Sequence, residues 1–287
     1  MLDHPTVTIV IATHSRPALL RACVESLAGV REPDQHVMIV ESGEASAAKI
    51  LAEVGMEAEV RHVDAIGKTA KMNEALRHVA TEVALFSDDD CRFERGWASA
   101  MAASFDDPGV GMAFGPVSGI SQAPGGPPGT PPAPGPAPYG PWTFAHGPSM
   151  ALRTQAARDA GGFDERLGPG TPARAGEEAD LLLRVREKGW RCVTTGAPEV
   201  RHVDWRSDEE DAANYRVFAF GAGAYIGAAL RRAPRANVKL FALLTGHYLE
   251  LWRDRVRSKP SFGPAIFLAF GRGVAHGLRL RPRPWLS

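Results

Sequence analysis

The sequence predicts an α/β fold, in which a mostly parallel, Rossmann-like sheet is flanked by helices and followed by a helical C-terminal extension. Three observations support this prediction. Through the first half of the chain, β-branched apolar runs alternate with helical patterns at the spacing of a doubly wound sheet. From residue 207 onward the pattern is helical, with breaks near Pro234 and Pro260. The hydrophobic content of 44% is sufficient for a full core.

The first strand is predicted over residues 6–12, a continuous apolar run typical of a strand buried on both faces of a parallel sheet. A helix should follow, with Ser15 as its N-cap and Pro17 in its first turn. The same criteria predict the other elements of this half: strands at 36–40, 60–63, 83–86 and 110–114, helices at 45–54 and 68–79, and a helix beginning at 96–97.

Residues 122–141 (QAPGGPPGTPPAPGPAPYGP) are too rich in proline and glycine for regular structure. They form either a mobile loop or a passive spacer. Regular patterns resume with a strand at 147–153, a helix at 177–188 and short strands at 191–195 and 199–203. We therefore divide the chain into an α/β domain at 1–205, with 122–141 as a loop, and a basic helical region at 206–287.

Charge is unevenly distributed, although the formal net charge is zero. From residue 212 to the end, the chain has 13 Lys and Arg against two acids, Glu250 and Asp254. Such a tail suits an anionic partner such as a membrane surface. Alternatively, its arginines only solvate the outer faces of helices.

No apolar run reaches the roughly 18 residues of a spanning helix, so we expect neither a membrane-spanning segment nor, from the opening residues, a secretory signal. The opening residues also lack a basic segment and a cleavage site. Cys23, Cys91 and Cys192 form no CxxC pair, which argues against a disulfide framework and a thiolate zinc site. We therefore predict a cytoplasmic protein, with a peripheral position at the inner face of the membrane as the alternative that the basic tail suggests.

Three adjacent acids, Asp88, Asp89 and Asp90, follow the predicted strand at 83–86. Adjacent carboxylates repel one another, but a hard divalent cation such as Mg²⁺ or Mn²⁺ compensates their charge. Alternate residues of an extended segment point the same way, so Asp88 and Asp90 can address one ligand. The structural alternative is a solvated acidic turn in which one aspartate caps the next helix.

Acidic residues also end other predicted strands. Glu41, Asp64 and Asp88 all fall at the carboxyl ends of strands. Ligands of doubly wound sheets bind beyond those ends. This convergence predicts a binding site at that edge of the sheet.

A second acidic cluster opens the helix predicted at 177–188. The helix dipole alone explains Glu177 and Glu178 in its first turn. Asp180 with Arg184 has the spacing of an ordinary helical ion pair. His202 lies on a short apolar strand, where it is either a packed histidine or, beside a metal, an imidazole ligand.

Taken in order, these segments resemble the motifs of family 2 glycosyltransferases, which have the GT-A fold of the nucleotide-diphospho-sugar transferase superfamily. VTIVIATHSRP resembles the first strand and nucleotide loop, GKTAKMNEA the segment along the nucleotide, and SDDDC the DxD position. GPSMALR and AGGFDERLG resemble the acceptor-side strand and glycine turn. GEEADLLLRVREKGW resembles the segment with the catalytic acid, and the similarity spans about residues 6–203.

The resemblance implies a metal-dependent, inverting glycosyltransferase that moves a single sugar from a nucleotide-diphosphate donor to a hydroxyl acceptor. It implies Glu178 as the general base, with Glu177 and Asp180 as alternates. It implies Asp90 and His202 as ligands of a divalent metal, Mn²⁺ or Mg²⁺, with Asp88 as an additional candidate.

The resemblance also implies contacts with the two substrates. The acceptor side would include His146, Gly147 and Trp205. The nucleotide sugar would contact Ala12, Thr13, Arg16, Glu41, Asp64, Lys68, Asn73, Asp88 and Asp89.

The chain departs from the family pattern in three places. Glu41 stands where the family often has Asp, and Glu177-Glu178 replaces the usual Glu-Asp pair. The Pro/Gly segment replaces the usual loop sequence. The QxxRW signature of processive synthases is absent, which favours transfer of one sugar over polymer synthesis.

Other classes of function fit less well. A sugar nucleotidyltransferase would carry a glycine-rich phosphate loop, whereas residues 12–16 contain no glycine. A non-catalytic nucleotide-sugar-binding relative would not need the acids, and an oxidoreductase would carry GxGxxG. The expected partners are a nucleotide-diphospho-sugar donor, a hydroxyl acceptor such as a lipid-linked or envelope glycan, and a membrane surface, with no nucleic acid.

Overall fold

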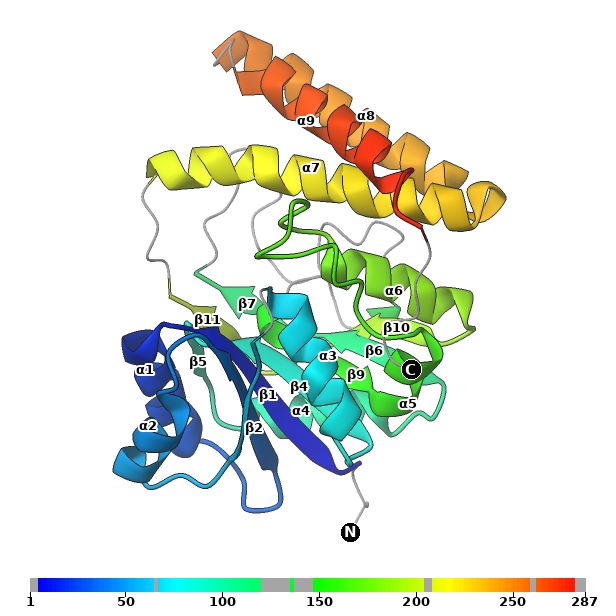
Figure 1. The fold of residues 1–287 in the computed structure, drawn as a ribbon. Helices are drawn as coiled ribbons and strands as arrows, with labels where there is room; N and C mark the ends of the chain where they lie inside the picture. Colours follow the sequence, from blue (N-terminus) through cyan, green and yellow to red (C-terminus); the bar gives the residue numbers. More distant parts are fainter. Residues whose placement is uncertain are drawn as a thin grey trace.

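The computed structural model describes residues 5–64, 67–119, 135–136, 147–203, 208–258 and 262–281. An α/β unit carries a layer of three long helices above one edge of its sheet (Figure 1). The Pro/Gly segment 122–141, apart from residues 135–136, lies outside the described residues. So does the predicted domain boundary between residues 205 and 206.

The central sheet is mostly parallel, as predicted. Four strands in the order β3-β2-β1-β4 run parallel to one another. Strand β9 then runs antiparallel to both β4 and β6, and β10 is parallel to β6. The strands are β1 (Val7–His14), β2 (His36–Ser42), β3 (Glu59–His62), β4 (Val83–Asp88), β6 (Val110–Phe114), β8 (Gly135–Pro136), β9 (Met150–Arg153) and β10 (Arg191–Thr194).

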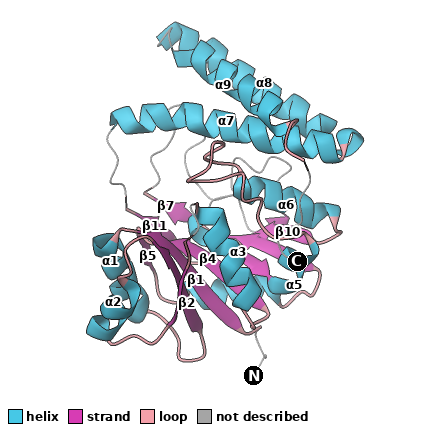
Figure 2. Ribbon diagram, viewed as in Figure 1, coloured by secondary structure: helices cyan, strands magenta, loops and turns pink. Residues whose placement is uncertain are grey.

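Helices cover both faces of this sheet (Figure 2). Side chains of β1 alternate between the faces. Ile9 and Ile11 pack with α1 (Pro17–Ala28), α2 (Ala47–Val54) and α4 (Trp97–Ala102). Val10 packs on the other face with α3 (Lys68–His78), α5 (Thr154–Asp159) and α6 (Glu177–Glu187).

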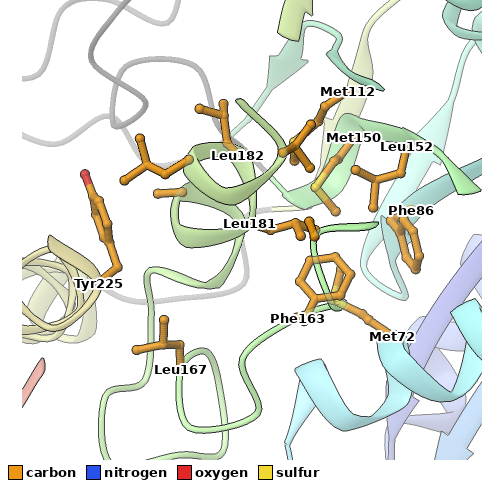
Figure 3. Packing of buried hydrophobic residues seen from close by; sticks show 14 of the residues in the cluster. Met72, Phe86, Met112, Met150, Leu152, Phe163, Leu167, Leu181, Leu182 and Tyr225 are labelled. Atoms are coloured by element: carbon orange, nitrogen blue, oxygen red, sulfur yellow. The ribbon is translucent and has the colours of Figure 1, made fainter. Parts of the chain in front are cut away.

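The second of these cores continues into the C-terminal layer. Phe86 of β4, Leu181 of α6 and Tyr225 of α7 belong to one buried cluster (Figure 3). The layer consists of α7 (Asp208–Arg232), α8 (Pro234–Ser258) and α9 (Phe262–Gly277), which confirms the helices predicted after residue 207. No described helix combines the length and apolar character needed to span a bilayer.

Glycines allow α7 and α9 to pack with their backbones in contact. A Cβ added at Gly223 or Gly227 of α7 would collide with the carbonyl oxygen of Phe270 or Val274. A Cβ at Gly273 of α9 would collide with the carbonyl oxygen of Phe220. Because glycine has no Cβ, it is the residue that permits such close approach.

Two local predictions were wrong. Helix α1 begins at Pro17, and Ser15 does not cap it. Instead, Ser15 has φ 47°, and its Oγ accepts a hydrogen bond from the backbone N–H of Glu44 at 3.0 Å. The strand predicted at 147–153 begins only at Met150. A 3₁₀ turn precedes it, in which the Pro148 carbonyl accepts a hydrogen bond from Ser87 Oγ at 2.7 Å.

Two glycines of α9 test the close packing. Gly273→Ala should lower the unfolding free energy by about 1–3 kcal/mol, since the added methyl overpacks the contact with α7. Gly271→Ala is the matched control, because nothing lies within 4 Å of its Cβ position. That substitution should raise the unfolding free energy by up to about 1 kcal/mol through helix propensity. Urea denaturation measures both, and equal effects would contradict the proposed packing.

Candidate metal and carboxylate site

The acidic segment lies at the carboxyl edge of the central sheet. Asp88 is the last residue of β4, and it pairs in register with Ala12 of the parallel strand β1. Glu41 lies near the end of the neighbouring strand β2. The structure therefore brings together the strand ends that the sequence singles out.

A second, smaller sheet brings His202 to the acids. Strand β11 (Val200–His202) pairs antiparallel with β5 (Cys91–Phe93) and parallel with β7 (Val117–Ser118). His202 Nε2 lies 3.3 Å from Asp90 Oδ1. Ligand atoms of Asp88, Asp90 and His202 all lie within 4.8 Å of one another. Two carboxylates and an imidazole are a donor set that fits a divalent cation such as Mn²⁺ or Mg²⁺.

Asp89 lies behind this group and is fully buried. Its Oδ2 accepts hydrogen bonds from Thr13 Oγ1 at 2.6 Å and Arg16 Nε at 3.1 Å. Burial raises its pKa to about 6, although the charge of Arg16 opposes the shift. Arg16 also pairs with Asp90 at 3.3 Å. Asp89 therefore anchors the loop after β1 against the acidic segment.

Lys68, the first residue of α3, joins the two acidic clusters. Its Nζ lies 2.6 Å from Asp88 Oδ1 and 3.7 Å from Glu178 Oε1. Burial alone would lower the pKa of Lys68, but the charges of Asp88, Glu178 and Glu177 raise it above its ordinary value. The lysine therefore stays charged between the clusters.

Glu177 and Glu178 open α6. Burial raises the pKa of both carboxyls; the charge of Glu178 adds to the shift at Glu177, whereas Lys68 opposes the shift at Glu178. Glu177 is 3% exposed, and its Oε2 has no hydrogen-bond partner among the described residues. Glu178 is less deeply buried and directs its Oε1 toward Lys68. Of the two, Glu178 is the carboxylate that borders the metal-ligand group.

Gly147 leaves room for these side chains. A Cβ at residue 147 would lie 2.7 Å from Lys68 Nζ and would collide with Glu178 Oε1. A side chain at this position would therefore displace the ammonium or the carboxylate. Gly147 was predicted on the acceptor side, together with His146 and Trp205, which lie outside the described residues.

Asp180 belongs to an ion-pair network that joins α6 to α7. It is 1% exposed and lies 2.8 Å from Arg184 Nε and 3.5 Å from Arg232 Nη1. Arg232, at the end of α7, also pairs with Glu187 at 2.8 Å. Asp180, the other alternate for the base, is thus engaged with two arginines.

Three other residues predicted to contact the nucleotide occupy different environments. Glu41 Oε2 accepts hydrogen bonds from the N–H groups of Ser46 and Ala47, both at 2.9 Å, at the start of α2. The amide of Asn73 is fully buried and bonds to the Phe163 backbone N–H at 2.8 Å and C=O at 2.9 Å. Asp64 is exposed just beyond β3.

Lys71 is a buried lysine that the sequence prediction missed. Its Nζ donates hydrogen bonds to Ser42 Oγ at 3.0 Å and to the Gly67 carbonyl at 3.1 Å. Burial lowers its pKa to about 8, against the opposing charge of Asp89. The signal was available, because residues three apart on a helix lie on one side, and Lys71 follows Lys68 at that spacing.

Comparison with known proteins identifies related sequences. The model of the family described as Glycosyl transferase family 2 matches residues 8–150. The chain is 28% identical over 263 residues to the pre-mycofactocin glycosyltransferase of Mycobacterium tuberculosis. The match covers 87% of this chain and 52% of the relative, so the chain spans about half the length of the curated relatives it matches.

Solved structures of glycosyltransferases share the fold. The mannosyltransferase PcManGT from Pyrobaculum calidifontis, in complex with GDP-Man and Mn²⁺, is 15% identical with a TM-score of 0.64 over 98% of this chain and 77% of that one. GalNAc-T7 with UDP, GalNAc and Mn²⁺ is 12% identical, with a TM-score of 0.57 over 81% and 51%. Glucosyl-3-phosphoglycerate synthase from Mycobacterium tuberculosis is 14% identical, with a TM-score of 0.53 over 75% and 78%. The predicted GT-A fold is confirmed.

The buried pair of Asp180 and Arg184 should be strongly coupled. Arg184→Ala should lower the unfolding free energy by about 3–5 kcal/mol, because it leaves the Asp180 carboxylate buried with less compensation. In the Arg184→Ala background, Asp180→Ala should lower the unfolding free energy far less than it does in the unmodified chain. The coupling energy from urea denaturation should be about 1–3 kcal/mol. The exposed pair of Lys49 and Glu53, at 4.0 Å, is the control and should couple by less than about 0.5 kcal/mol. Additive effects of the buried pair would contradict the network.

Proposed function

We propose that this chain, which carries a family 2 glycosyltransferase domain with the GT-A fold, is a metal-dependent, inverting enzyme that moves one sugar from a nucleotide-diphosphate donor to a hydroxyl group. The observation that carries the proposal is the arrangement at the sheet edge. There, Lys68 joins a divalent-metal ligand set to the carboxylate of Glu178.

Asp88, Asp90 and His202 are the residues that would hold the metal. A bound Mn²⁺ or Mg²⁺ would neutralise the negative charge that develops on the departing nucleoside diphosphate. Two structural neighbours, PcManGT and GalNAc-T7, are described as complexes with Mn²⁺ and a nucleotide or nucleotide sugar, which supports the proposal.

The donor would lie along the ends of β1, β2 and β4. Arg16 and Thr13 are fixed there by Asp89, which shapes the loop after β1 for the nucleotide. Lys71 and Ser42 are hydrogen-bonded to each other at the end of β2, so we place them near the nucleoside. The charge of Lys68 would favour the diphosphate, since it lies beside the proposed metal ligand Asp88.

Glu178 is the proposed base. Its Oε1 would take the proton of the acceptor hydroxyl while the hydroxyl oxygen bonds to the anomeric carbon. The bond between that carbon and the diphosphate oxygen breaks on the opposite side, which inverts the configuration. Lys68 holds Glu178 in place, and Gly147 keeps the space beside its Oε1 open.

The geometry of the site specifies only that the acceptor offers a hydroxyl group. Other surfaces of the chain would select the molecule that carries it. We favour a lipid-linked or cell-envelope glycan, because the C-terminal helical layer lies on the same side of the molecule as the site (Figure 1). An acceptor held at a membrane would reach Glu178 from that side.

Substitution of the two glutamates separates their roles. Glu178→Gln should lower kcat by about 10²–10⁴-fold, since the amide cannot take the proton, while donor affinity stays unchanged. Glu177→Gln is the matched control and should keep turnover within about tenfold, because its side chain is buried behind Glu178. Donor hydrolysis gives kcat, and calorimetry gives donor affinity. If Glu177→Gln alone abolishes turnover, the base is Glu177.

Substitution of the metal ligands should change the response to metal. Asp90→Ala and His202→Ala should weaken Mn²⁺ affinity by at least about tenfold, since each removes a ligand. Calorimetric titration of Mn²⁺ with a nucleoside diphosphate measures this affinity. Asp34→Ala removes an exposed acid from a loop and should leave the titration unchanged. An unaltered titration for Asp90→Ala would contradict the assignment.

A further inference from the structure

The C-terminal layer carries the exposed large apolar side chains of the described chain. All the large apolar side chains that are strongly exposed among the described residues lie on α7, on α8, on α9 or directly after α9. Their exposed fractions range from 38% to 57%. They are Phe218, Val238, Leu243, Trp252, Leu268 and Leu278.

Most of these side chains lie on the outermost two helices. Residues 221–229 of α7 are buried, because α7 lies between the α/β unit and the pair formed by α8 and α9 (Figure 1). Helix α8 buries Leu240, Leu244 and Tyr248, and α9 buries Ile266 and Phe270. The exposed side chains of Leu243 and Leu268, which lie between these positions, therefore face away from the molecule.

The same outer side carries exposed positive charge. Five exposed cations lie on it, and none forms an ion pair with any side chain that the structure describes. Glu250 is the one exposed acid among the described side chains of α8 and α9. The five cations are Arg235, Lys239, Arg253, Arg272 and Arg279. Together with Val238, Leu243, Leu268 and Leu278, they define the outer face.

Cations interleaved with apolar side chains on one face are typical of helices that lie in a membrane interface. The cations attract anionic headgroups, and the apolar side chains enter the boundary with the acyl chains. A second copy of the chain fits this face poorly. Two-fold pairing would bring the same five cations toward each other, and Glu250 alone among the described side chains of α8 and α9 would oppose them.

We propose that the outer face of α8 and α9 binds the surface of a bilayer that contains anionic lipids. The binding does not depend on catalysis, but its purpose rests on the proposed function, since it would hold the site beside a membrane-bound acceptor. The layer is tied to the site, because α7 packs against α9 and Arg232 of α7 pairs with Asp180 of α6.

Co-sedimentation of the full chain with vesicles tests the proposal. The chain should bind vesicles of phosphatidylcholine and phosphatidylglycerol, and bind far less to phosphatidylcholine alone. Arg235→Glu/Lys239→Glu should weaken binding by at least about tenfold, since each cation near an anionic surface contributes to attraction. Leu243→Ser/Leu268→Ser should also weaken it, because less apolar surface enters the interface.

Lys49→Glu/Arg95→Glu is the matched control. It makes the same change of charge at exposed positions of the α/β unit, and should leave vesicle binding unchanged. The proposal is overturned if the chain does not co-sediment with anionic vesicles. It is equally overturned if this control weakens vesicle binding as much as Arg235→Glu/Lys239→Glu does. It is also overturned if light scattering shows a dimer that the outer-face variant dissociates.

Donor hydrolysis, measured on the same samples without vesicles, separates this proposal from the proposed function. Arg235→Glu/Lys239→Glu should retain full hydrolysis while losing vesicle binding. If all samples bind vesicles as expected but none hydrolyses a nucleotide sugar, the surface is supported and the proposed function fails.

Discussion

Concentrated negative charge at the carboxyl edge of the sheet is the constraint on which the rest of the site depends. Asp88 and Glu178 come from two distant segments and meet around one cation, Lys68, while Asp90 lies beside Asp88 and His202. Buried carboxylates are costly unless they are paired. Lys68 and Arg16 supply part of the compensation, and the geometry leaves Asp88 and Asp90 beside His202, where a divalent cation would supply more.

This constraint explains why helices far from the sheet edge contribute to the site. Lys68 can join the clusters only if α3 and α6 keep their relative positions. Helix α6 is held by Arg184, which pairs with Asp180 and donates to the Ala160 carbonyl at 2.5 Å, and by Arg232 of α7. The C-terminal layer therefore helps to position the glutamates at the start of α6, although it contributes none of the proposed ligands.

Much of the fold was predictable, because long strands and helices have a clear period. The strand at 110–114 and the acids at the end of β4 are examples. The small sheet was less predictable. Of its three strands only β11 was predicted, because strands of two or three residues are too short to show a hydrophobic period. That sheet sets the distance from His202 to Asp90. Likewise, the crowding of Gly147 against Glu178 depends on a tertiary contact that no local pattern encodes.

The roles of the cations in the basic tail were also not predictable from the sequence. The sequence left open whether its arginines serve an anionic partner or only solvate helices. The structure separates them: Arg232 faces inward and pairs with Asp180 and Glu187, whereas Arg235 faces outward. Only the break between α7 and α8 divides these two residues. One part of the charge asymmetry thus stabilises the contact with α6, and the other part is left on a face that an anionic membrane would attract.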